Sequence, residues 1–204
     1  KNFIENKTIL ITHSTSGLGY ELAKLLSRYK CNLFITGKNN TEKIVEELSK
    51  FNENVKGMDF DLTNDPEILF ERAIKEFKYI DFFICIPIIN TGSKFIGKKK
   101  VLDLQHDLHV NITSIHKLMQ LFSDHVIYNK NKIKNSKIIT VISDLNEKNL
   151  NNSQTLLQDW LLQYNKKLAN ELVNTNLAIT NIKIDLPESS NIYSKLPSNM
   201  PNLK

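Results

Sequence analysis

The stretch ILITHSTSGLGYELAKLL, residues 9–26, decides how this sequence is interpreted. It starts with a run of apolar residues typical of a buried strand, passes through small residues, and ends in an amphipathic pattern typical of a helix. Such a turn lets a phosphate group approach the free N–H groups and the positive end of the helix. His13 is the exception, because turns of this kind usually carry glycine at that position.

The same alternation of strand and helix continues along the chain. Strands are predicted at residues 8–12, 32–36, 55–60, 79–86, 137–142 and 178–184, and helices at 18–29, 41–51, 65–77, 102–128 and 153–174. Thr41 is the predicted cap of the second helix, and Asp65 caps the third, with Pro66 in its first turn. Repeated alternation predicts an α/β fold, a doubly wound parallel (Rossmann-like) sheet of about six strands with helices on both faces. We expect one domain over residues 1–204, with an irregular tail from about residue 188.

Composition sets limits on the function. The 204 residues are 41% hydrophobic and 24% charged, which is ordinary for a globular protein. The net charge of +5 comes almost entirely from lysine, since Arg28 and Arg72 are the only arginines. Together with abundant Asn and Ile, this indicates the coding bias of an AT-rich genome, and we expect no nucleic-acid partner. The apolar runs are too short for a membrane span.

Cysteines and histidines carry no metal or disulfide pattern. Cys31 and Cys85 lie in apolar segments without motif spacing, which predicts buried free thiols in a reducing intracellular compartment. That compartment is the cytoplasm, or an organelle if a targeting segment precedes Lys1. His116 lies seven residues after His109, about 10 Å along a helix, so no metal site is expected.

The loop after the first strand offers groups for a dinucleotide phosphate. Gly17 and Gly19 allow close backbone approach on either side of Leu18, and Ser14 and Ser16 add hydroxyl donors. A serine-rich turn that binds no ligand remains the alternative at this point.

Several motifs together resemble the short-chain dehydrogenase/reductase superfamily. Thr12, Gly17 and Gly19 match its TGxxxGxG loop, with His13 in place of the first glycine. The resemblance extends to DLT at residues 61–63, VNIT at 110–113, IITVISD at 138–144 and LANEL at 168–172.

What the resemblance implies is a cofactor site and remnants of a catalytic one. The implied cofactor-binding residues are the loop positions Thr12, His13, Ser14, Ser16, Gly17, Leu18 and Gly19, with Asp61 and Leu62 near the adenine. The implied catalytic remnants are Asn111 and Ser143.

Cofactor choice depends on the end of the second strand. A carboxylate there holds the ribose hydroxyls of NAD, whereas a cation holds the 2′-phosphate of NADP. Lys38 follows the strand in FITGKNN without an acid, which favours NADP(H); a merely solvated lysine is the alternative.

The resemblance also shows which chemistry is missing. The family's reaction needs a tyrosine as proton donor and a lysine four residues later to lower its pKa. Counting back from LANEL places this pair on Gln154 and Gln158, and glutamine does not titrate. The pair Tyr164 and Lys167 has a spacing one residue too short. Asp144 stands where a second serine is expected, beside Ser143.

Further departures fall at the turns that frame the nicotinamide. The turn after the fourth strand reads CIPI at residues 85–88, and the turn after the sixth has Glu188 after Pro187 in place of Pro-Gly. His13 either donates to a phosphate or fills the space that the pyrophosphate would occupy.

These departures predict a catalytically inactive member, a binding or assembly subunit with residual NADP(H) binding. An NADPH-dependent carbonyl reductase with relocated catalytic groups is the alternative. The helices around residues 109–128 and 153–174 commonly build a dimer interface in the family. The second is apolar almost all round, so we expect a protein partner or a homodimer through them.

Overall fold

Six parallel strands form one sheet with the order β3-β2-β1-β4-β5-β6. The computed structural model describes residues 3–87, 97, 99–144 and 152–185, and for residues 143–144, 152–154 and 185 only the backbone. The strands are β1 (Thr8–Ile11), β2 (Asn32–Gly37), β3 (Val55–Asp59), β4 (Phe82–Cys85), β5 (Ser136–Asp144) and β6 (Leu177–Asp185). The predicted doubly wound Rossmann-like fold is confirmed. Strand order reverses between β1 and β4, and we call this place the switch point.

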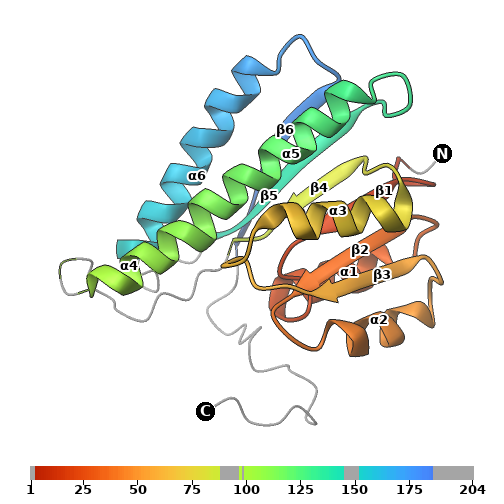
Figure 1. Cartoon of the computed structure of the whole chain (residues 1–204), viewed down its shortest axis with the longest axis horizontal. Coiled ribbons are helices and arrows are strands. Elements are labelled where there is room, and N and C mark those ends of the chain that lie inside the picture. The colour runs from red at the N-terminus through yellow and green to blue at the C-terminus, as the bar shows by residue number, and fades with distance from the viewer. Residues whose placement is uncertain (1–2, 88–96, 98, 145–151, 186–204) are drawn as a thin grey trace.

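Helices cover both faces of the sheet (Figure 1). The first face carries α1 (Gly17–Leu26) and α2 (Thr41–Ser49), and the second carries α3 (Pro66–Phe77), α5 (Ser114–Tyr128) and α6 (Asn152–Glu171). Helix α4 (Val101–Leu108) runs into α5 through the π-helical turn η2 (His109–Thr113), so the helical region predicted at residues 102–128 is one continuous helix. Of the helices described, none is long and apolar enough to cross a membrane.

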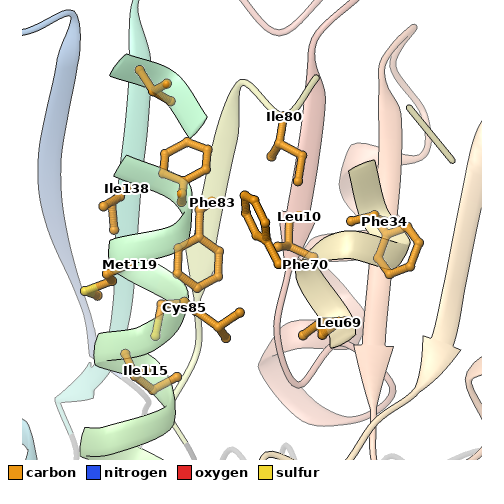
Figure 2. Packing of buried hydrophobic residues seen from close by; sticks show 14 of the residues in the cluster. Leu10, Phe34, Leu69, Phe70, Ile80, Phe83, Cys85, Ile115, Met119 and Ile138 are labelled. Atoms are coloured by element: carbon orange, nitrogen blue, oxygen red, sulfur yellow. The ribbon is translucent and has the colours of Figure 1, made fainter. Parts of the chain in front are cut away.

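The two faces have separate apolar cores because side chains alternate along each strand. Leu10, Phe83 and Ile138 point to α3, α5 and α6, and Figure 2 shows them packed with Phe70, Ile115 and Met119. Their neighbours in sequence point the other way, to α1 and α2: Ile9, Ile11, Phe82 and Ile84. Strands buried on both faces explain the nearly continuous apolar runs in the sequence.

Two of the helices differ in how their first N–H groups are bound: one is capped by a residue next to it in sequence, the other by a residue on a neighbouring strand. Asp65 caps α3 as predicted, since its Oδ1 accepts from the N–H of Glu67 at 3.0 Å. The prediction that Thr41 caps α2 is wrong: Asn40 holds the cap position with φ of 64°. The N–H of Thr41 donates instead to Oδ1 of Asp59, on the neighbouring strand, at 2.8 Å. The predicted irregular tail from residue 188 lies outside the described residues.

Candidate functional site

The turn between β1 and α1 folds tightly onto its own helix. Gly17 has φ of 54°, a backbone conformation that glycine adopts without strain. A Cβ on Gly19 would overlap the carbonyl oxygen of His13, so this helical position accepts only glycine. Ser16 is exposed at the start of α1 and makes no side-chain cap bond, so the first N–H groups of the helix are left for water or a ligand.

Two of the predicted cofactor residues have structural roles. The hydroxyl of Ser14 is buried between strands, where its single hydrogen is shared between the carbonyls of Ile11 and Thr36 and its oxygen accepts from the N–H of Thr36 at 2.9 Å. Thr12 is also buried, and its Oγ1 accepts from the N–H of Ile86 at 3.0 Å. Leu18 lines an apolar groove of about 340 Å³ beside α1. The predicted hydroxyl contact of Ser14 with phosphate is therefore not what this geometry offers.

His13 spans the switch point. It follows β1 with φ of 49°, and its Nδ1–H donates to the carbonyl oxygen of Ile86, just after β4, at 2.5 Å. Burial lowers the pKa of His13, opposed by the bond to Ile86 and by the charge of Asp61. The imidazole is therefore neutral at pH 7, with the proton on Nδ1. No local sequence pattern marks Ile86 as its partner.

The residues predicted for the adenosine end of a cofactor lie together on the other side of β1. Nζ of Lys38, after β2, is 2.8 Å from Oδ2 of Asp61, after β3. The bond from Lys38 lowers the pKa of Asp61 to about 2, partly opposed by burial and assisted by Thr63. The Lys38 side chain is 72% exposed, so a phosphate can reach it. Leu62 is buried, and its carbonyl accepts from Ser114 Oγ at 2.6 Å.

Asn111 lies in η2, where the helix widens, a feature often found at functional sites. Its side chain is buried, and Nδ2 donates to the carbonyl of Asp107 at 3.2 Å. The Asp107 carboxylate forms a close ion pair with Lys99, a nearly buried pair that the sequence did not suggest. Ser143 stands at the end of β5 in register with Ile184, and its side chain lies outside the described residues, as does that of Asp144.

Gln154 and Gln158 lie near the start of α6, whereas Tyr164 lies further along the helix axis. Gln158 is buried in the fold, while Gln154 is described by its backbone alone. Tyr164 lies ten residues beyond Gln154, about 15 Å along the helix. Its hydroxyl is 2.6 Å from His116 Nδ1 on α5, and its ring stacks on Trp160 with 4.9 Å between centroids.

The two cysteines lie in the interior of the fold. Cys31 and Cys85 are free and buried, as predicted, and burial raises the pKa of Cys85 to about 12. No cluster of three metal-ligating side chains occurs within the described part of the chain.

The chain is similar to known proteins in sequence and in fold. A family model described as short chain dehydrogenase matches residues 7–155. Dehydrogenase/reductase SDR family protein 7-like of Dictyostelium discoideum is 28% identical over 192 residues, and the match covers 86% of this chain. The chain spans 58% of the length of that relative.

Solved structures share the fold at low identity. A 3-ketoacyl-(acyl-carrier-protein) reductase from Brucella melitensis, complexed with NADH, matches with a TM-score of 0.80 at 17% identity, over 93% of this chain and 80% of that one. A short chain dehydrogenase/reductase from Burkholderia phymatum, in complex with NAD, matches at 0.81 and 15%, over 91% and 68%. Because the family model alone matches well over half of the chain, this chain belongs to the short-chain dehydrogenase/reductase superfamily.

Proposed function

We propose that this chain binds NADP(H) at the switch point, does not catalyse hydride transfer, and serves as a binding or assembly subunit. The main support for the proposal is the presence of two glutamines on α6 at the positions expected for the catalytic pair. Gln158 is buried where the family's lysine is expected, with Gln154 one turn earlier at the tyrosine position. A glutamine amide has no proton to give at neutral pH, and it carries no charge that would lower the pKa of a neighbour.

Tyr164 is a poor replacement for the missing proton donor. A catalytic tyrosine needs a pKa close to the working pH, whereas burial and the charge of Glu171 raise the pKa of Tyr164. Lys167, one turn further along α6, is exposed. These features argue against the alternative, an NADPH-dependent carbonyl reductase that uses Tyr164 and Lys167.

The choice of NADP(H) rests on Lys38. The solved relatives named above are complexes with NAD or NADH. In this chain the second strand ends at an exposed ammonium group, and the carboxylate beside it comes from Asp61 and is already paired. A 2′-phosphate would compete with Asp61 for Lys38 and would gain a charge-assisted hydrogen bond.

The outer surface of α5 and α6 is our proposed partner surface. A groove of about 370 Å³ lies between these helices, lined by His116, Gln120, Ile127, Tyr164 and Leu168 among others. Ile127 is 41% exposed, and the half-buried Trp160 stacks on Tyr164. Aromatic and aliphatic side chains grouped on an outer surface fit a second copy of the chain.

Titration with NADPH, followed by its fluorescence, tests the binding claim, and a panel of carbonyl substrates tests turnover in the same samples. We expect saturable binding and no carbonyl-dependent oxidation of NADPH. Turnover that Tyr164→Phe abolishes would establish the alternative. Absence of binding at millimolar NADPH would leave the assembly role alone.

Light scattering after size exclusion tests the partner surface. We expect a dimer that Ile127→Asp disrupts, whereas Leu25→Asp on α1, which is 52% exposed and lies on the opposite face of the sheet, leaves it intact. A wild-type monomer would contradict the homodimer.

A further inference from the structure

The contact between His13 and Ile86 lies where a doubly wound sheet takes its dinucleotide. Such sheets bind the two mononucleotide halves on either side of the strand reversal, at the carboxyl ends of the strands. His13 follows β1 and Ile86 follows β4, so their 2.5 Å hydrogen bond joins the two strands that flank the reversal. A group that passes from one half-site to the other has to cross this bond.

The bond is held from both ends. The carbonyl of His13 sits against Gly19 of α1, and its φ of 49° fixes the direction in which the side chain leaves the backbone. The backbone of Ile86 is tied to β1 by its N–H, which donates to Thr12 Oγ1. Swinging the imidazole aside therefore requires breaking its hydrogen bond to the carbonyl of Ile86.

The protonation of His13 also works against a phosphate at this place. With Nδ1–H donating to Ile86, Nε2 of the neutral ring is a hydrogen-bond acceptor. An acceptor repels phosphate oxygens, whereas an imidazolium would attract them. Asp61 is the charged group that acts on His13, and its carboxylate is already paired with Lys38.

Within the described part of the chain, the adenosine half-site makes no hydrogen bond to His13, although the charge of Asp61 reaches the imidazole. Lys38 and Asp61 come from the ends of β2 and β3, on the far side of β1 from Ile86. Neither side chain is hydrogen-bonded to His13 among the contacts of the described residues. An adenosine phosphate that docks at Lys38 can therefore bind while the switch point stays bridged.

We propose that the His13–Ile86 hydrogen bond closes the nicotinamide half of the site, so that this chain recognises an adenosine nucleotide with a ribose 2′-phosphate and gains little from the rest of a dinucleotide. The inference rests on the proposed function, which places NADP(H) at the switch point. It differs in making His13 the determinant of which half of the ligand contributes binding energy.

Calorimetric titration of the whole chain with three probes tests this selectivity: adenosine 2′,5′-bisphosphate, NADP+ and nicotinamide mononucleotide. For the wild type we expect dissociation constants for the bisphosphate and NADP+ within about threefold, and no heat from the mononucleotide at millimolar concentration. In His13→Gly, NADP+ should bind about tenfold more tightly, while the bisphosphate changes by less than about threefold.

Two further variants keep the result interpretable. Lys38→Met should weaken the bisphosphate and NADP+ by the same factor, since both bind there. His13→Asn, which tolerates positive φ but has a shorter side chain, should reproduce the gain for NADP+ if the glycine variant folds poorly.

The outcomes separate this inference from the proposed function. Wild-type NADP+ binding about tenfold tighter than the bisphosphate, without turnover, overturns the inference and leaves the proposed function standing. An equal increase in affinity for NADP+ and for the bisphosphate in His13→Gly also overturns the inference. So does the absence of binding to either ligand by the wild type and by His13→Gly. Turnover of NADPH would contradict only the proposal that the chain is catalytically inactive. The role of His13 would still be decided by the ratio of the dissociation constants of NADP+ and the bisphosphate.

Discussion

The two sides of the switch point are built from different kinds of interaction. On the β1–β2–β3 side, the turn and the strand ends keep the groups that a cofactor needs: Gly17, Gly19, and the exposed Lys38 beside Asp61. On the β4–β5–β6 side, Ile86 is bridged by His13, and the buried Gln158 of α6 stands where our proposal places the missing lysine. We propose that the first side binds the cofactor and that the second side has lost this role.

The difference shows that a residue of a cofactor-binding motif can be required by the fold, even where the cofactor is no longer bound. Gly19 has to be glycine because the carbonyl of His13 occupies the space of its Cβ. That requirement holds whether or not a cofactor is bound. The tyrosine and the lysine of α6, by contrast, serve the reaction in the family. The loop is therefore strong evidence for the fold and weak evidence for activity.

Gly19→Ala should have the largest effect on this comparison. The added methyl group meets backbone atoms of His13 and Ser14 that cannot turn aside, so we expect a loss of roughly 3 kcal/mol in the free energy of unfolding. Urea unfolding measures it. Gly97→Ala, where nothing lies within 4 Å of the new Cβ, should change stability by less than about 0.5 kcal/mol. Equal losses in the two variants would mean that the tight turn is not maintained by packing.

Thr12→Val removes the hydrogen bond from the N–H of Ile86 to Thr12 Oγ1, which joins the two sides of the switch point, without changing the shape of the side chain. The N–H of Ile86 loses its buried acceptor, which should cost about 2 kcal/mol of unfolding free energy. Thr12→Ser keeps the oxygen and serves as the control, and denaturant midpoints of the two variants compare them directly. A valine variant as stable as the serine variant would show that water replaces the lost acceptor.

Tyr164→Phe tests whether the tyrosine of α6 is structural. Loss of the hydroxyl contact with His116 should lower the free energy of unfolding by no more than about 1 kcal/mol and leave NADPH binding unchanged. Tyr128→Phe, at a position 91% exposed, should have no measurable effect on thermal unfolding. A change in NADPH affinity would place Tyr164 closer to the cofactor than this fold does.

Lys38→Met should have the smallest effect on stability and a clear effect on titration. The pKa of Asp61 is lowered to about 2, so its pairing stabilises the folded chain above pH 4 or so, and this is lost as the pH falls towards 2. Because Lys38 is largely exposed, the difference at pH 7 should be below about 0.5 kcal/mol. In an NMR titration, the Asp61 pKa should rise in Lys38→Met and stay low in Lys43→Met. An unchanged pKa would assign the shift to Thr63.

Local features of the structure were predictable from the sequence. The cap of α3 depends on Asp65 and Pro66, adjacent residues whose geometry is set within one turn. The cap of α2 was mispredicted because its acceptor, Asp59, lies on another strand 18 residues away. The strand–helix alternation and the matched loop were sufficient for the fold and the superfamily.

Contacts between distant parts of the chain were beyond the reach of sequence patterns. Ile86 is 73 residues from His13, and its contribution is a backbone carbonyl, which every residue type provides. The pairing of His116 with Tyr164 likewise depends on how α5 and α6 meet.

The sequence by itself determined the doubly wound sheet and the phosphate-type turn, because periodicity and residue identity act locally, and it predicts the loss of the tyrosine–lysine pair. Only the tertiary structure decided that Ser14 is buried between strands, that Lys38 is paired but accessible, and that His13 reaches across to β4. Those outcomes depend on which strands lie next to each other, and adjacency in the sheet is set by the packing of the whole chain.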